Sequence, residues 1–176
     1  MDYAAVYGAI HQNDKYFPGY ALTRYAAEVA DLVRQTQPRS LLDYGSGKGY
    51  QYLARRLHDT WGGLLPVCYD VGVRQLAVRP EGTFDGIICS DVLEHIDEDD
   101  LPALLADVFG FVSEREAPAE SFVFFAISCI PSRHKLLPDG RNVHVTLQPP
   151  EWWRALLANF ERPGLRIHSV YQVEPL

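Results

Sequence analysis

The feature that most constrains the fold is a glycine-rich turn directly behind a short apolar run. In the stretch LLDYGSGKGY, residues 41–50, the glycines Gly45, Gly47 and Gly49 occupy alternate positions and the apolar run ends on Asp43. Because glycine loses more backbone freedom on folding than any other residue, three of them in one bend need a structural reason. We expect a strand, a tight turn that comes close to a ligand, and then a helix.

The rest of the chain alternates strand-like and helical patterns. Helical spacing of apolar residues precedes the glycine turn and returns in 50–57, 101–112 and 152–160, where the first of these helices would bury Tyr50 and Leu53. Strand-like runs end on acidic residues, and the run SFVFFAISC is apolar almost throughout, which is typical of a strand covered on both faces. The pattern predicts an α/β, Rossmann-like open sheet, mostly parallel, with about five or six strands and helices on both faces.

Composition and charge limit the possible partners. The chain has 176 residues, enough for a single domain, and 16 Lys and Arg against 23 Asp and Glu give a net charge of −7. Since the basic residues are spread along the chain, we expect no nucleic-acid partner. No apolar window approaches a membrane span and the N-terminus lacks a signal pattern, so we expect a cytoplasmic protein without membrane contact. The three cysteines have no metal-type spacing and are expected to be free thiols.

Three kinds of glycine turn compete for residues 43–50. A phosphate-binding P-loop needs Ser or Thr after its lysine, but Lys48 is followed by Gly49. The dinucleotide pattern Gly-x-Gly-x-x-Gly would start at Gly45 and would put Tyr50 where a small residue belongs, which weakens that interpretation without excluding it.

The remaining pattern, Asp43 followed by glycines at 45, 47 and 49, resembles motif I of class I S-adenosylmethionine-dependent methyltransferases. Asp70 ends the next strand, and FDGIICSDVLEHI, residues 84–96, is similar to the family's fourth-strand segment. The resemblance covers about residues 38–128 and implies S-adenosylmethionine as the cofactor. The cofactor-binding residues that it implies are Asp43, Tyr44, Gly45, Gly47, Lys48, Gly49, Asp70, Asp91, Val92 and Leu93.

Physical chemistry agrees with this resemblance. Glycines let the main chain approach a ligand without side-chain collision, and the N-terminus of the following helix offers unpaired N–H donors. Asp70 can accept both ribose hydroxyls through its two carboxylate oxygens. The aromatic-rich opening segment, with Tyr16, Phe17 and Tyr20, can fold over the cofactor as a lid whose rings attract the cationic sulfur, or its aromatic side chains can pack in the core.

The chain also departs from the family. Only residues 71–83 separate Asp70 from Phe84, too few for the usual helix, strand and helix. The third strand is therefore expected to be reduced or missing, as is the final antiparallel hairpin.

Candidate catalytic residues follow the third predicted strand. By the resemblance, Glu94 and His95 face the transferred methyl group, and His95 could deprotonate a hydroxyl or amine acceptor, although a packed core histidine is an open alternative. His144 is the third catalytic candidate.

The long loop RHKLLPDGRNVH has the side chains to hold a polar substrate, with His134, Arg141 and Asn142 as candidates, or it is simply solvated. A metal site of His134, Asp139 and His144 lacks supporting spacing, and no metal is predicted.

The resulting expectation is one domain, residues 1–176, that methylates a small polar metabolite. It divides into a lid and helix region (1–37), a cofactor-binding core (38–128), a substrate loop (129–148) and a terminal helix and strand (149–176). Open alternatives are a lyase or cyclase that consumes S-adenosylmethionine, a non-catalytic protein that binds it and, less favoured, an NAD-type oxidoreductase. Self-association is also possible.

Overall fold

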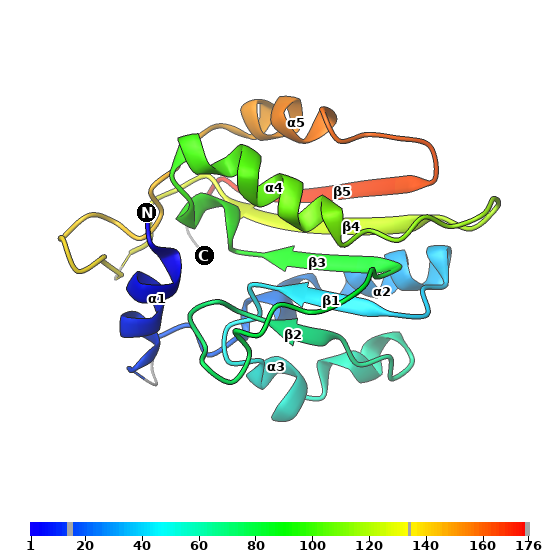
Figure 1. Cartoon of the computed structure of the whole chain (residues 1–176), viewed down its shortest axis with the longest axis horizontal. Helices are drawn as coiled ribbons and strands as arrows, with labels where there is room; N and C mark the ends of the chain where they lie inside the picture. Colours follow the sequence, from blue (N-terminus) through cyan, green and yellow to red (C-terminus); the bar gives the residue numbers. More distant parts are fainter. Residues whose placement is uncertain (14–15, 134, 175–176) are drawn as a thin grey trace.

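The centre of the molecule is one open parallel sheet (Figure 1). A computed structural model describes residues 1–13, 16–133 and 135–174. In this part of the chain five strands, all parallel, lie in the order β2-β1-β3-β4-β5. The strands are β1 (Leu41–Tyr44), β2 (Val67–Tyr69), β3 (Gly86–Ser90), β4 (Ser121–Ser128) and β5 (Leu165–Gln172). The predicted α/β, Rossmann-like sheet is confirmed.

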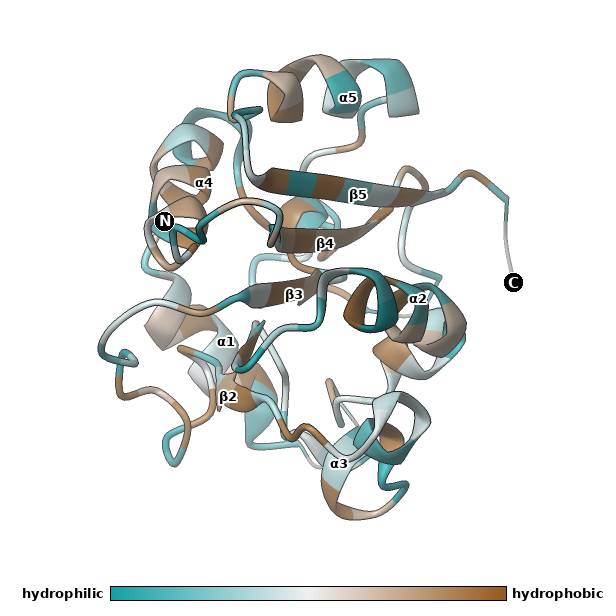
Figure 2. Ribbon diagram, turned by 90° about the vertical axis from the view of Figure 1, so that its right-hand side faces the viewer, coloured by the Kyte–Doolittle hydropathy of each residue, from teal (hydrophilic) through white to brown (hydrophobic). Residues whose placement is uncertain are grey.

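Helices cover both faces of this sheet, and Figure 2 shows α4 and α2 on opposite sides of the strands. The α-helices are α1 (Tyr3–His11), α2 (Ala26–Thr36), α3 (Tyr50–Leu53), α4 (Leu101–Gly110) and α5 (Pro150–Ala158). Short 3-10 turns are η1 (Ala21–Tyr25), η2 (Leu57–Trp61), η3 (Leu93–His95) and η4 (Glu98–Asp100). None of the helices in the described ranges is both long and apolar enough to span a bilayer.

The core consists of two apolar layers, one on each face of the sheet. Along β4, Val123 and Phe125 join the layer that contains α4 and α5, whereas Phe122 and Phe124 join the layer that contains α2. All four side chains are fully buried. The apolar run of this strand therefore has the cause expected from its sequence, because both of its faces are covered.

The helix behind the glycine turn is shorter than predicted, and its inner face was predicted wrongly. It has one turn, and Tyr50 and Leu53 are 37% and 78% exposed, whereas Gln51 and Tyr52 are buried. Both buried side chains donate hydrogen bonds to Asp43 at 2.8 Å. These polar contacts with a buried carboxylate, rather than apolar spacing, set the rotation of α3.

The expected loss of a strand between Asp70 and Phe84 is confirmed. Residues 70–85, all of which the structure describes, contain no helix or strand, and β2 is a three-residue edge strand. At the other edge β5 lies parallel to β4, and no terminal hairpin occurs within the described residues.

The sheet order places a ligand crevice beside β1. The chain runs from β1 to β2 on one side and then returns to β3 on the other side. Such a reversal opens a crevice beyond the carboxyl ends of the two central strands. Helix α1 and the loop between β4 and α5 lie beyond this edge of the sheet (Figure 1).

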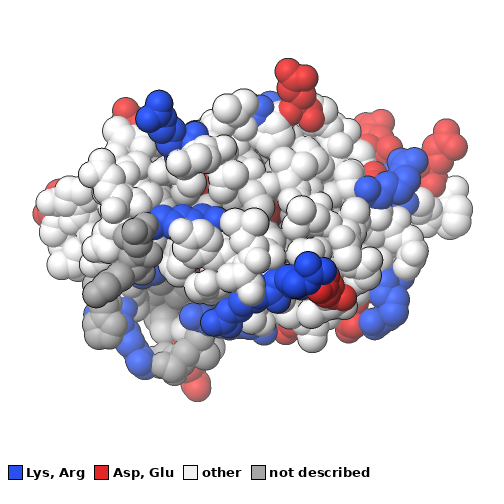
Figure 3. Space-filling view, turned by 90° about the horizontal axis from the view of Figure 1, so that it is seen from below, with Lys and Arg blue, Asp and Glu red and all other residues white. Residues whose placement is uncertain are grey.

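One face of the molecule carries dispersed charged side chains. On the face shown in Figure 3, Lys and Arg stand in several separate groups, and Asp or Glu lies beside some of them.

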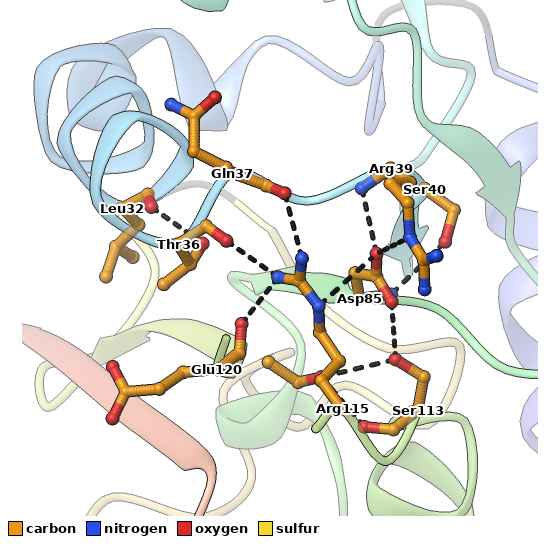
Figure 4. Close-up of polar contacts among 10 residues, drawn as sticks. Leu32, Thr36, Gln37, Arg39, Ser40, Asp85, Ser113, Arg115 and Glu120 are labelled. Carbon is orange, nitrogen blue, oxygen red and sulfur yellow. Dashed lines mark hydrogen bonds and ion pairs between the residues drawn. The ribbon is translucent and has the colours of Figure 1, made fainter. Parts of the chain in front are cut away.

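The amino-terminal edge of the sheet is held by a buried ionic network around Asp85 (Figure 4). Its carboxylate accepts hydrogen bonds from the Arg39 backbone N–H at 2.9 Å, from Arg39 Nε at 3.1 Å and from Ser113 Oγ at 2.6 Å. Arg115 Nε lies 3.7 Å away. Burial raises the pKa of Asp85, but these partners outweigh burial and hold the pKa below its usual range.

Candidate functional site

Two adjoining cavities lie at the carboxyl edge of the sheet. The larger has a volume of about 470 Å³ and the smaller about 210 Å³. We call them the polar compartment, lined by Asp43, Lys135 and His144 among others, and the apolar compartment, lined by Tyr44 and Tyr69 among others. Both are lined by Phe17, Gly45, Gly47, Asp91 and His95. The shared walls make them two parts of one site.

The sequence suggested that the glycine turn makes room for a ligand. In the structure, the groups that pack closely against the glycines are other parts of this chain. Gly45, Gly47 and Gly49 have φ of +77°, +57° and +66°. A Cβ atom on Gly45 would lie 2.3 Å from Val92 Cγ2, and one on Gly47 would lie 2.7 Å from Phe17 O. The absent side chains therefore make room for the segment behind β3 and for the N-terminal segment.

Residues 16–20, which we call the N-terminal strap, also pair with the amides that the sequence suggested were open to a ligand. Three amides at the start of α3 donate to consecutive strap carbonyls: Lys48 to Phe17 at 3.3 Å, Tyr50 to Pro18 at 3.2 Å and Gln51 to Gly19 at 2.8 Å. The expectation of unpaired donors at this helix N-terminus was therefore wrong. The strap satisfies them.

Asp70 fixes the glycine turn and lines the apolar compartment. Its Oδ2 accepts the Gly47 N–H at 2.8 Å and its Oδ1 accepts the Gly72 N–H at 2.9 Å. A carboxylate oxygen can accept two hydrogen bonds, so each keeps capacity for a ligand hydroxyl.

Asp43 lies behind the turn and lines the polar compartment. Burial raises its pKa to about 7, although the hydrogen bonds from Tyr52 and Gln51 oppose that shift.

The Phe17 ring stands between the compartments. Its centroid lies 5.9 Å from that of Tyr7, 5.6 Å from that of His11 and 5.4 Å from that of His95. Lys135 Nζ lies 4.2 Å from the ring centroid. The face of the Phe17 ring therefore already attracts one cation, the Lys135 ammonium group.

The catalytic candidates Glu94, His95 and His144 meet beside the polar compartment. Glu94 and His95 belong to η3, and His144 comes from the loop behind β4, yet one potential ligand atom of each lies within 4.8 Å of the others. We call them the Glu94–His95–His144 cluster. Burial raises the pKa of Glu94 well above its usual value, lowers that of His95 to about 3 and also lowers that of His144.

The other predicted cofactor residues fall into two groups. Tyr44, Val92 and Asp91 line the apolar compartment. Lys48, Gly49 and Leu93 lie outside the linings of both compartments, and Leu93 is a fully buried core residue.

Two of the predicted substrate residues, Arg141 and Asn142, do not line the cavities. Arg141 is 52% exposed and pairs with Asp139 at 2.8 Å. Asn142 is used inside its loop, where its Oδ1 accepts the N–H groups of Ser132 and His144. His134 lies outside the described residues.

Sequence reasoning missed several lining residues. The missed residues come from four segments and all line a compartment: Tyr7 and His11 from α1, Ser46 from the turn, Ser128 from the end of β4, and Lys135 from the loop behind it. In the sequence, the aromatic residues of the opening segment were the one indication of these lining residues. The others could not be predicted, because they depend on how segments far apart in the chain meet.

Comparison with known proteins agrees with the fold. The family described as methyltransferase domain matches residues 17–116, which is 100 of 176 residues and more than half of the chain. Neither curated proteins nor solved structures give a match. The chain therefore belongs to the methyltransferase domain family, and its fold is that of a class I S-adenosylmethionine-dependent methyltransferase.

Proposed function

We propose that this protein transfers a methyl group from S-adenosylmethionine to a small polar metabolite. The observation that carries the proposal is the continuity of the site. Its apolar compartment has Asp70 in its wall, its polar compartment borders the Glu94–His95–His144 cluster, and Phe17 lies between them. A cofactor bound across this junction would present its reactive centre to an acceptor in the polar compartment.

The residues of both compartments fit the cofactor. The volumes of about 470 and 210 Å³ together lie in the range of small-molecule sites. Tyr44 and Tyr69 give the apolar compartment aromatic walls suited to a purine, and Asp70 has capacity for the ribose hydroxyls. S-adenosylmethionine, when bound, supplies an electrophilic methyl group on a positively charged sulfur.

The polar compartment supplies groups that can orient an acceptor. At neutral pH the lowered pKa values keep His95 and His144 as neutral imidazoles, each with one hydrogen-bond-accepting nitrogen. Such nitrogens can accept a hydrogen bond from a hydroxyl or amine and so align it, while the Phe17 ring excludes water from the junction. Alignment and exclusion of water are what a displacement at a methyl group requires.

Charge and size support a small acceptor. The net charge of −7 and the spread of the basic residues along the chain argue against an acceptor with a phosphate backbone. We also propose a cytoplasmic location, because all three cysteines are free thiols and thus suited to a reducing compartment.

Calorimetry tests the cofactor first. We expect S-adenosylmethionine and its demethylated product to bind and NAD not to bind. Incubation with a metabolite extract and methyl-labelled S-adenosylmethionine should then yield a labelled metabolite. If neither sulfur compound binds, the proposal fails, and label found only in fragments of the cofactor would favour cleavage or cyclisation instead.

The ribose role of Asp70 is tested by Asp70→Asn. The amide keeps one acceptor oxygen for the turn but cannot accept two hydroxyls, so we expect S-adenosylmethionine affinity to fall at least about tenfold. Asp31→Asn, on the exposed face of α2, is the matched control. Equal affinity in the two variants would remove Asp70 from the cofactor site.

A further inference from the structure

We propose that Glu94, His95 and His144 bind a first-row divalent transition-metal ion beside the polar compartment. The sequence predicted no metal, because the set considered there, His134, Asp139 and His144, lacks supporting spacing. The fold brings the three together.

The distances suit a metal ion. One potential ligand atom from each residue lies within 4.8 Å of the other two, and the two imidazole rings are 4.9 Å apart at 87°. Ligand atoms around an ion with bonds of about 2.1 Å lie about 3 to 3.5 Å apart. Small side-chain rotations therefore complete the site.

Both histidines already have the tautomer that a metal ligand needs. His95 Nδ1 lies 3.0 Å from Val143 O, and His144 Nδ1 lies 2.7 Å from Ile130 O. Because a carbonyl can only accept, each Nδ1 carries the hydrogen and each Nε2 keeps its lone pair. This main-chain partner on the second ring nitrogen is the usual arrangement around metal-bound histidine.

Glu94 provides an independent reason for a cation. Its side chain is fully buried, and Oε1 accepts the Ser128 N–H at 3.0 Å. Oε2 is also buried but has no hydrogen-bond partner among the described residues. A buried carboxylate oxygen without a partner is costly, and a metal ion bound by His95 and His144 would satisfy it.

The loop that carries His144 is fastened to η3. The Glu94 carbonyl accepts the N–H groups of Val145 at 2.8 Å and Thr146 at 3.1 Å, and Thr146 Oγ1 donates to Ile96 O at 2.6 Å. Asn142 Oδ1 holds the His144 N–H at 2.9 Å. These bonds fix the three ligands relative to one another before an ion arrives, which gives Asn142 and Thr146 a positioning role.

The ligand set selects the class of ion. Two imidazoles and one carboxylate suit Mn²⁺, Fe²⁺, Co²⁺ or Zn²⁺, whereas Mg²⁺ and Ca²⁺ prefer oxygen ligands alone. The polar compartment is also lined by acidic and basic side chains, so charges of both signs act on the ion: Asp43, Asp91, Arg24, Arg133 and Lys135. Since His95 and His144 line this compartment, the remaining coordination positions are on the acceptor side.

The role of the ion rests on the proposed function, and when the ion is bound it contacts the acceptor in place of the Nε2 atoms that hold it. An acceptor hydroxyl that binds a divalent ion loses its proton more readily: the O–H bond breaks, the proton passes to solvent water, and the electron pair stays on the oxygen. The ion thus favours acceptors with a hydroxyl or carboxylate oxygen that can enter the polar compartment.

Metal binding is measured on the full chain after treatment with a chelator and its removal. We expect titration with Mn²⁺ or Zn²⁺ to show one site per chain, and Mg²⁺ to bind at least about tenfold more weakly. Co²⁺ should give visible absorption bands from nitrogen coordination. The absence of binding by all three transition metals would overturn the proposal.

His144→Gln removes one ligand, and His168→Gln, in β5 outside the cluster, is the matched control. In His144→Gln only, we expect Mn²⁺ affinity to fall at least about tenfold. The metal-induced rise in melting temperature should vanish in the same variant. Equal losses in both variants, or none in either, would refute the site. Titration of S-adenosylmethionine into chelator-treated protein tests the proposed function separately, because it requires no metal.

Discussion

The two edges of the sheet bury carboxylates in opposite ways. At the amino-terminal edge, Asp85 is surrounded by Arg39, Ser113 and Arg115, and its pKa is held below the usual range. At the carboxyl-terminal edge, Asp43 and Glu94 are buried without a cationic partner among the described residues, and burial raises both pKa values.

We interpret Asp85 as a group that stabilises the fold, and the carboxyl groups at the carboxyl-terminal edge as groups available to bind a ligand. Asp85 has its cations within the chain, so its burial is compensated during folding. Glu94 keeps an unpartnered oxygen that only a further group can satisfy. Buried charge without compensation is most often found where a protein binds or reacts, because the cost is recovered there.

The largest expected effect comes from removing Asp85, whose carboxylate is paired at the amino-terminal edge. Asp85→Ala should lower the free energy of unfolding by about 3 to 5 kcal/mol, because Arg115 would then lose its carboxylate in a buried position. Urea denaturation gives the value. Arg39→Ala, which removes a largely exposed partner, should cost about 1 kcal/mol or less. If the two variants cost the same, the network is not the stabilising unit described above.

Glu94→Gln tests the carboxyl-terminal edge, where one oxygen of the Glu94 carboxyl group has no hydrogen-bond partner among the described residues. The amide keeps the shape and the acceptor for Ser128 N–H, so the free energy of unfolding should change by less than about 1 kcal/mol. Methyl label transferred from S-adenosylmethionine should fall at least about tenfold, since the metal ligand is lost. A variant that is severely destabilised yet fully active per folded molecule would reverse the comparison.

The pH dependence of stability should have opposite signs at the two edges. The pKa of Asp43 rises from 3.8 to about 7 on folding, so between about pH 4 and pH 7 the folded state holds a proton that the unfolded state lacks, and its contribution weakens as pH rises. The pKa of Asp85 falls on folding, so its contribution is present above the usual value of 3.8 and is lost as pH falls toward its folded pKa.

Asp43→Asn should therefore gain stability relative to the natural chain as pH rises from about 4 to 7, by up to about 1.4 kcal/mol per pH unit. Denaturation midpoints across this range measure the slope. An Asp43→Asn curve parallel to that of the natural chain would show that the buried carboxyl does not titrate there.

The smallest expected effect concerns the exposed loop. Arg141→Ala should change the free energy of unfolding by less than about 0.5 kcal/mol and leave label transfer intact, because the side chain pairs on the surface outside both compartments. Loss of transfer in this variant would restore the sequence-based expectation that Arg141 holds the substrate.

Most of the fold could be predicted because its signals are local. Continuous apolar runs predicted buried parallel strands. The segment 71–83 was too short for another strand with its helices. The face of α3 could not be predicted, since contacts of Gln51 and Tyr52 with Asp43 override the apolar spacing of Tyr50 and Leu53.

The candidate site was predictable where a motif lies on one segment. The glycine turn, Asp70 and the Glu94–His95 pair all lie at strand ends, where parallel sheets place ligands. The meeting of His144 with Glu94 could not be read from spacing, because it depends on bonds between the loop behind β4 and η3.

The N-terminal strap has a kinetic consequence. Its three carbonyls hold the start of α3, and Phe17 lines both compartments, so a ligand that extends across the junction lies against a segment fastened by three hydrogen bonds. Lifting the strap breaks these bonds together and leaves three amides unpaired at a helix end. We therefore expect the dwell time of a bound ligand to follow the opening rate of residues 16–20.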